Sequence, residues 1–247
     1  MKSQEIVGNA NGKFSVRRNL FHKYPKAARH FLSLFPNNYL DIAELKDGPR
    51  LRKQIREFRK LLDLPTVSER KIIKFINGKP AYFIIGALLK RYFTFGHHDA
   101  FLFREFPLGT SHRADYLLVG RSSDGWSFVF VELESPARST VKDGNVASSF
   151  RKGASQITEW EEWLEANYGS LREFFNKCRN PGQELSAEFI ELDITRLNFV
   201  IIAGRRRDFK DRTYRVRRRN RKDGRELILH YDNLADAAEA VIGQPTY

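Results

Sequence analysis

Cysteine is almost absent from this chain of 247 residues, in which Cys178 is the only thiol. A single thiol cannot form an internal disulfide, and it cannot supply the cysteine set of a structural zinc site. The sequence therefore excludes a disulfide-stapled fold and predicts a reducing, cytoplasmic setting.

Long apolar runs are also missing. The longest run, Ala81–Leu89, has nine residues, whereas a membrane-spanning helix needs about 20. The first residues, MKSQEIVGNANGKF, lack the apolar core of a signal peptide. We find no internal repeat and no low-complexity tract, and we expect no association with a membrane.

Apolar side chains are nevertheless plentiful. Hydrophobic residues make up 41% of the chain and aromatic residues 13%, with 20 phenylalanines. This composition is typical of a folded chain with a real core. The length suits one large domain, or one domain with a small appendage.

Positive charge is concentrated in one segment. The net charge is +13, and residues 204–225 hold twelve Lys/Arg against three Asp, so nine of the thirteen excess charges lie there. Such a cluster favours a polyanionic partner, because neutralising phosphates releases counterions. DNA is the expected partner of this segment; a solvated helix face or loop, or contact with a membrane or a protein, are the alternatives.

Residues 1–63 form a small N-terminal part of unknown role, expected to be mainly helical. One helix is expected within Phe21–Phe35 and another over Arg50–Leu62, where Leu51, Ile55 and Phe58 recur at helical spacing. Residues 64–247 form the second and larger domain.

Alternating and helical patterns follow one another in the larger domain. Thr66–Glu69 is typical of a capping box that opens a helix, and Ala81–Phe95 predicts a buried helix. Two more helices are expected over Ser148–Phe175, broken near Tyr168–Gly169, and over Asp232–Ile242. The expected strands are Phe101–Phe106, His112–Val119, Trp126–Glu134, Leu197–Ala203 and Glu226–His230. This order predicts an α/β domain with a central mixed sheet flanked by helices.

Three acidic residues lie in two neighbouring strands of that sheet. Glu132 and Glu134 share one strand face with Phe128 and Phe130, and a hairpin would bring Asp115 beside them. Carboxylates in apolar strands are costly unless they are paired. Mg²⁺ takes such oxygen ligands and assists phosphodiester hydrolysis. The alternative is that these acids are exposed or pair with Arg113, Arg138 or Arg151.

Two further side chains are candidates for the same site. Glu69 can complete an acidic site from a helix, or it can simply serve the capping box. Gln156 shares a helix face with Trp160 and can orient a water or contact DNA, or it can be a surface amide.

Blocks around these residues resemble the PD-(D/E)XK nuclease superfamily, and more closely the Shedu family of bacterial anti-phage nucleases. Arg113–Tyr116 resembles an "R-x-D-(F/Y)" strand and Val131–Pro136 a "VELKxP" strand. The remaining blocks are the helix Ser68–Ile76 with its early Glu, Ala154–Ile157 with Trp160, the "GR" strand end Ile201–Arg205, and the "YDxL" turn Tyr231–Leu234. The resemblance covers roughly residues 65–242.

The resemblance implies a restriction-endonuclease-like fold and a metal-dependent DNA endonuclease that uses Mg²⁺ or Mn²⁺ in anti-phage defence. It implies Asp115 and Glu132 as metal ligands, position 134 as the third catalytic position and Gln156 as a supporting residue. It also implies a homo-oligomer. The basic segment would then grip the DNA backbone through Arg205, Arg206, Arg207, Arg215, Arg217, Arg218 and Arg219.

Position 134 departs from the family pattern, because it is Glu where the family usually has Lys. Glutamate cannot supply a positive charge, but it can act as a general base or as a further metal ligand. Three functions remain open: an active endonuclease, a degenerate nuclease fold that binds DNA or a protein, and a regulatory protein that binds RNA or an anionic surface.

Overall fold

The computed structural model describes most of the chain. The backbone is described for residues 6–8, 15–17, 23–136, 141–142, 145–146, 148–223 and 226–247, and the side chains for residues 23–136, 151–218 and 226–247. Arg138 and the side chain of Arg219, both considered above, lie outside these ranges.

A five-stranded mixed sheet forms the centre of the protein, in the order β3-β4-β5-β8-β9. Strands β3, β4 and β5 pair antiparallel, whereas β8 runs parallel to β5 and β9 parallel to β8. The strands are β3 (Asp99–Leu108), β4 (His112–Ser122), β5 (Gly125–Leu133), β8 (Leu197–Ile202) and β9 (Glu226–Leu229). All five expected strands are therefore confirmed.

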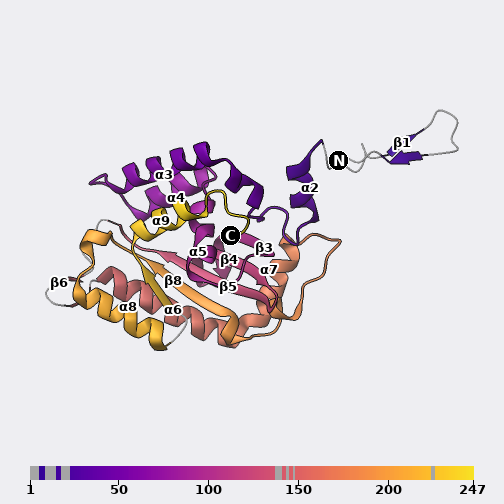
Figure 1. The fold of residues 1–247 in the computed structure, drawn as a ribbon. Coiled ribbons are helices and arrows are strands. Elements are labelled where there is room, and N and C mark those ends of the chain that lie inside the picture. Colours follow the sequence, from indigo (N-terminus) through magenta and orange to yellow (C-terminus); the bar gives the residue numbers. More distant parts are fainter. Residues whose placement is uncertain are drawn as a thin grey trace.

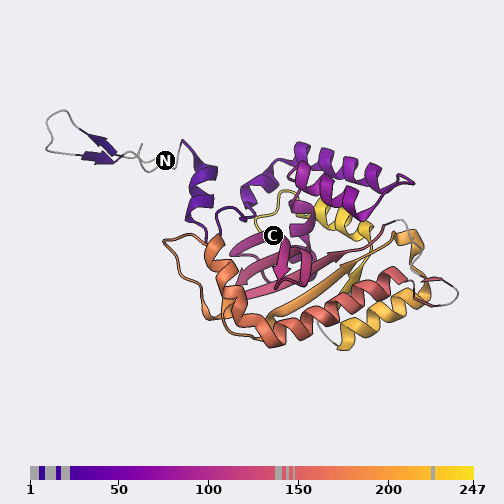
Figure 2. The same cartoon turned by 180° about the vertical axis from the view of Figure 1, so that it is seen from behind.

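Helices cover both faces of this sheet. On one face lie α3 (Gly48–Leu62), α4 (Glu69–Gly78), α5 (Phe83–Tyr92) and α9 (Tyr231–Val241). The other face carries α6 (Ser148–Asn167), α7 (Leu171–Cys178) and α8 (Asp211–Asp223). Figures 1 and 2 show the two layers on opposite sides of the strands, with α6 and α8 side by side. The α/β architecture expected from the order of elements is confirmed.

Short elements complete the chain. They are α2 (Pro25–Leu32), the hairpin β1 (Ile6–Gly8) and β2 (Ser15–Arg17), the hairpin β6 (Val141–Lys142) and β7 (Asn145–Val146), and the 3-10 turns η1 (Ile42–Lys46), η2 (Tyr168–Ser170), η3 (Ala187–Phe189), η4 (Ile194–Arg196) and η5 (Arg206–Asp208). The turn η2 separates α6 from α7, which confirms the expected break at Tyr168–Gly169.

Two apolar clusters, one on each face, hold the layers together. Val129, Val131 and Leu133 of β5 join the cluster under α3, α4, α5 and α9. Phe128 and Phe130 join the cluster under α6 and α7, which is rich in aromatic rings. The alternation expected for β5 is thus confirmed.

The N-terminal part packs on the same sheet. Leu51, Ile55, Phe58 and Leu62 of α3 are buried in the first cluster together with residues of the strands. The division of the chain after residue 63 therefore remains a prediction about domains, while α3 itself is part of the covering layer.

Among the described residues, no single helix is long and apolar enough to cross a membrane. Within the same residues, the pair α4 and α5, taken together across a bend of 100°, reaches the required length and apolarity.

The first turn of α4 differs from the expected capping box. Ser68, not Thr66, is the N-cap residue, and its hydroxyl accepts a hydrogen bond from the backbone N–H of Lys71. Glu69 is therefore the first helical residue and is not bound in the reciprocal pattern of a capping box.

The side-chain alternation of β3 is interrupted at Glu105. Glu105 has a φ of +46°, in the left-handed region that non-glycine residues avoid. Phe103 and Phe106 on either side of it both face the aromatic cluster, so the alternation of β3 shifts there by one residue. Arg104 and Phe106 pair with Tyr116 and Ala114, which places Asp115 opposite the shift.

Arg205 joins three distant parts of the chain. Its guanidinium donates to both carboxylate oxygens of Asp232, at 2.9 and 3.1 Å, to Asp63 at 3.0 Å, and to the carbonyl oxygen of Leu62 at 2.6 Å. Burial alone would raise the pKa of Asp232, but the hydrogen bonds from Arg205 and from the backbone of Arg206 lower it to about 2. The "GR" strand end and the "YDxL" turn thus meet as partners in one clamp.

Arg205→Ala is expected to lower the free energy of unfolding by on the order of 3 kcal/mol, because it leaves Asp232 without its partner. Arg206→Ala is the matched control, since Arg206 is exposed and pairs with the exposed Asp236; its loss should cost under about 1 kcal/mol. Urea denaturation measures both, and equal effects would contradict a structural role for Arg205.

Candidate active site

Four carboxyl groups gather where β5 ends. Asp115 comes from β4, Glu132 from β5, Glu134 from the residues just after β5, and Glu69 from the start of α4. Glu69, Asp115 and Glu134 each contribute to raising the pKa of at least one other of these acids. The convergence of Asp115, Glu132 and Glu134 expected from the strand pattern is present, and Glu69 joins them from a helix on the opposite layer to α6.

Asp115 is fixed by the backbone of β5. The ladder between β4 and β5 has its last pair at Tyr116 and Val131. Beyond that pair, Asp115 Oδ2 accepts a hydrogen bond of 2.8 Å from the backbone N–H of Leu133. The carboxylate therefore takes a position that a strand carbonyl would otherwise occupy.

Glu132 and Glu134 are both almost fully buried. Glu132 pairs with Ile201 across the parallel ladder to β8. The backbone N–H of Glu134 donates to Ile202 at 2.8 Å, and its carbonyl oxygen accepts the Tyr231 hydroxyl at 2.7 Å. The strand end that carries the acids is thus tied on two sides.

Helix α6 approaches this strand end closely because Gly153 has no side chain. A Cβ at position 153 would lie 3.0 Å from Ile201 Cγ2 and 3.5 Å from Glu134 Cγ. The preceding residue, Lys152, places its Nζ atom 3.1 Å from Glu134 Oε1. The ion pair of Glu134 is therefore made with Lys152, and not with either described arginine considered above, Arg113 or Arg151.

Gln156 lies one turn further along α6, on the side of Lys152 and Gly153. Its side-chain oxygen is buried and accepts no hydrogen bond from the described groups. A buried amide oxygen without a partner is costly, so this atom has capacity for a ligand or a water. Trp160, on the same side, is fully buried in the aromatic cluster.

Burial governs the acidity of the cluster. Desolvation raises the pKa of Asp115 to about 7, although the Leu133 N–H opposes the shift. Desolvation, and then the charges of Asp115 and Glu134, raises the pKa of Glu132 to about 9. Desolvation and Glu134 also raise the pKa of Glu69. These groups therefore hold protons at pH values where free carboxyls have lost them.

Two important neighbours were not assigned a role from the sequence. Lys152 precedes Gln156 by four residues, a spacing that places both on one helix face and is the signal that would have indicated it. Tyr231 belongs to the "YDxL" turn, but nothing in its sequence context predicts a hydrogen bond to position 134, because that contact depends on how α9 packs.

The arginines of the basic segment fall into different environments. The buried Arg205 is engaged in the clamp described above, and Arg206 pairs with Asp236. Arg207, Arg215 and Arg218 are exposed, whereas Arg217 is half-buried. Tyr214 and Val216 pack on the aromatic cluster, so α8 presents its basic side outward.

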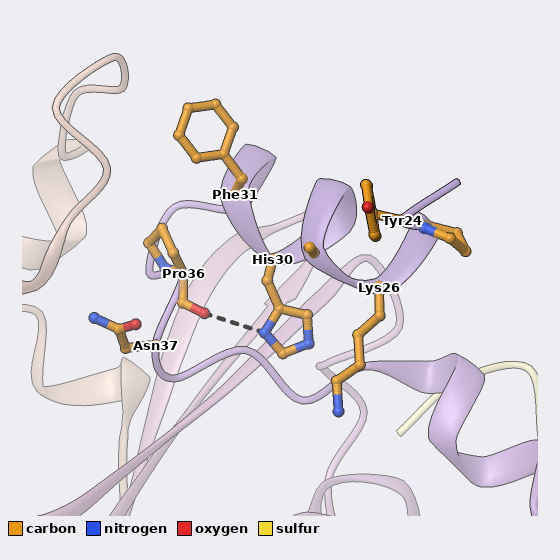
Figure 3. Close-up of a pocket in the computed structure, with 8 residues that line it drawn as sticks. Tyr24, Lys26, His30, Phe31, Pro36 and Asn37 are labelled. Atoms are coloured by element: carbon orange, nitrogen blue, oxygen red, sulfur yellow. Dashed lines mark hydrogen bonds between the residues drawn. The ribbon is translucent and has the colours of Figure 1, made fainter. Parts of the chain in front are cut away.

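A cavity lies elsewhere, around α2. Its volume is about 620 Å³ and it is formed by Tyr24, Lys26, His30, Phe31 and neighbouring residues. Figure 3 shows the His30 ring facing the carbonyl oxygen of Pro36, at a distance of 3.1 Å, with no carboxylate among the residues drawn. This groove lacks the acid chemistry of the cluster, which we therefore take as the candidate active site.

The donor set suits a hard divalent cation. Within the described ranges, no three His, Cys, Asp or Glu side chains are arranged as ligands of one ion. Mg²⁺, however, is typically held by one or two carboxylates, with water and phosphate oxygens completing its shell. Asp115 and Glu132 provide two such carboxylates, and the Gln156 oxygen provides unused acceptor capacity nearby.

The structure thus places the protein in the α/β class, with a buried acidic cluster at the end of a central strand. Residues 66–235 match the family described as "Shedu protein SduA, C-terminal". The chain belongs to this family, and membership implies a role in defence against phage. A comparison with curated proteins found no match.

Glu132→Gln is expected to flatten the pH dependence of stability of the metal-free protein. The pKa values of Asp115 and Glu132 rise on folding, from ordinary values of 3.8 and 4.5 to about 7 and about 9. Between these limits the folded state holds more protons than the unfolded state, so stability falls as pH rises. Urea denaturation in EDTA from pH 5 to 9 measures the slope.

Glu173→Gln is the control for this measurement, because Glu173 is exposed on α7 and pairs with Lys177. Its pH dependence should match that of the wild type. Parallel curves for Glu132→Gln and the wild type would show that Glu132 does not titrate as described.

Proposed function

We propose that this protein is a metal-dependent DNA endonuclease of the PD-(D/E)XK type, acting in the cytoplasm in anti-phage defence. The observation that carries the proposal is the meeting of Asp115 and Glu132 at the end of β5, beside the cation of Lys152 and the unpartnered oxygen of Gln156. Acids alone would repel a phosphodiester, whereas acids that share a cation and a metal ion can bind it.

Asp115 and Glu132 are the proposed ligands of Mg²⁺ or Mn²⁺. Such an ion, when bound, would polarise the phosphodiester and lower the pKa of a water molecule. The Leu133 N–H fixes the carboxylate of Asp115, and the ladder to β8 fixes the backbone of Glu132. Gln156 would orient a water or a phosphate oxygen with its free acceptor and its amide hydrogens.

Hydrolysis adds the oxygen of one water to phosphorus and breaks the bond from phosphorus to one sugar oxygen. One proton of that water must be accepted, and the leaving oxygen must gain one. Glu69 is the proposed acceptor, because its pKa is raised and it is only partly buried at the start of α4. Solvent would supply the proton to the leaving oxygen.

The exposed side of α8 is the proposed DNA contact. Arg215 and Arg218 are three residues apart and exposed, so they lie on one side of the helix. Arg207 and Lys210 extend the positive surface before α8. Arginines on a helix surface bind phosphates irrespective of base sequence. Arg205 is left out of this interface because its donors are used inside the protein.

A catalytically degenerate fold that only binds DNA or a protein is the second candidate. Glu134 in place of the usual lysine favours it. Metal binding separates the two functions, because millimolar Mg²⁺ or Mn²⁺ should raise the melting temperature of a protein with a working site. The homo-oligomer that the resemblance implies is a further part of the proposal, which sedimentation would test.

Glu132→Ala is expected to abolish Mg²⁺- or Mn²⁺-dependent cleavage while DNA binding in EDTA stays within about twofold of the wild type, because Glu132 is buried and acts on the metal and not on the DNA backbone. Agarose gels of supercoiled and linear DNA measure cleavage. Glu173→Ala, far along the chain on α7, is the control and should cleave normally. Full activity of Glu132→Ala would refute the assigned site.

The double change Arg215→Ala and Arg218→Ala is expected to weaken DNA binding equally on unrelated sequences. It should also reduce the slope of log K against log[salt] by about one for each phosphate that the protein no longer neutralises. Fluorescence anisotropy from 50 to 300 mM salt measures both. Arg172→Ala, an exposed arginine of α7, is the control; an equal effect there would mean that α8 has no special part in binding.

A further inference from the structure

Lys152 forms an ion pair with the acidic cluster through Glu134, and it lies on α6, away from position 134. Position 134 carries Glu instead of Lys. Glu134 adds a fourth carboxyl group to the site, at the position where the resemblance implies a lysine. A phosphodiester approaching Glu69, Asp115, Glu132 and Glu134 would meet repulsion unless a cation compensates.

Lys152 of α6 supplies a positive charge beside Glu134. Its Nζ atom lies 3.1 Å from Glu134 Oε1, so the ammonium group occupies the space immediately beside position 134. Burial alone would lower the pKa of Lys152, but the hydrogen bond to Glu134 and the charges of Glu132 and Glu69 outweigh it and raise the pKa. The side chain is therefore a fixed positive charge at neutral pH.

The two members of the pair differ in access. The Glu134 side chain is 5% exposed and the Lys152 side chain 62% exposed. A substrate arriving from solvent therefore reaches the ammonium group, while the carboxylate stays behind it. Lys152 also lies in the second turn of α6, whose N-terminus adds positive potential in the same place.

The local packing holds this arrangement. A Cβ at position 153 would lie 3.0 Å from Ile201 Cγ2, so Gly153 lets α6 lie close to β8, with the neighbouring Lys152 beside the strand end. Tyr231 anchors the carbonyl group of Glu134 from the opposite layer. Position 134 is thus held from both sides, and its carboxylate is aimed at α6.

We infer that Lys152 is the cation that contacts the reacting phosphodiester, and that Glu134 is a positioning residue that holds the Lys152 ammonium group in place. The positive charge of the site then comes from α6 instead of from position 134, just after β5. This inference rests on the proposed nuclease function.

The test moves the cation between the two positions. Lys152→Gln should lower the rate of Mg²⁺-dependent cleavage of a defined duplex by about 100-fold, the effect typical of removing one stabilising group. Adding Glu134→Lys to Lys152→Gln should then raise the rate at least tenfold. Adding Glu134→Gln instead should restore nothing, because it removes the unpaired acid without returning a cation.

Two readouts that do not depend on turnover accompany the rates. The rise in melting temperature on adding Mg²⁺ alone should be retained in Lys152→Gln, since the proposed ligands Asp115 and Glu132 are untouched. Duplex binding in EDTA should change by less than threefold. Lys177→Gln is the control, because Lys177 is an exposed lysine that pairs with the exposed Glu173 on α7, away from the acidic cluster, and it should cleave as the wild type does.

Several outcomes would overturn the inference alone while the wild type cleaves and Glu132→Ala does not. These are cleavage by Lys152→Gln within threefold of the wild type, equal rescue by Glu134→Gln and Glu134→Lys, and disappearance of the Mg²⁺-dependent melting shift. Equal rescue would mean that Lys152 only neutralises Glu134. A wild type that never cleaves DNA with Mg²⁺ or Mn²⁺ would instead overturn the proposed function, and this inference with it.

Discussion

The burial of four neighbouring carboxyl groups is the constraint on which the rest of this structure depends. Burial disfavours the ionisation of these acids, and the charges of neighbouring acids disfavour it further. Burial, and then the charges of Asp115 and Glu134, raises the pKa of Glu132 to about 9. The surrounding fold holds the carboxyl groups together, and a nearby positive charge lowers the cost of ionising them.

The surrounding elements provide that fixation by different means. The Leu133 N–H holds Asp115, the Tyr231 hydroxyl holds the Glu134 backbone, and Lys152 pairs with the Glu134 carboxylate. The first two contacts involve the sheet and α9, whereas the third comes from α6. Residues from both helical layers therefore contact the end of β5 and hold the acidic residues in place.

Local sequence patterns predict much of this structure. Side-chain periodicity and the placement of glycine predict the strands, the two faces of β5 and the break after α6. The sequence also predicts that Asp115, Glu132 and Glu134 lie close together. Other features depend on packing and have no local signature. The pairing of Lys152 with Glu134 depends on the close approach of α6 that Gly153 allows. The role of Arg205 depends on Asp63 and Asp232, which are distant in the sequence, so the sequence alone groups Arg205 with its basic neighbours.

The meeting of early and late segments has a consequence for the order of folding. Helices α3 and α5 pack against α9, Tyr231 supports Glu134, and Asp232 closes the Arg205 clamp. A nascent chain that has reached β5 therefore carries its acids without the side chains that confine them. The contacts around the acidic cluster are therefore complete only after residue 232 has been synthesised.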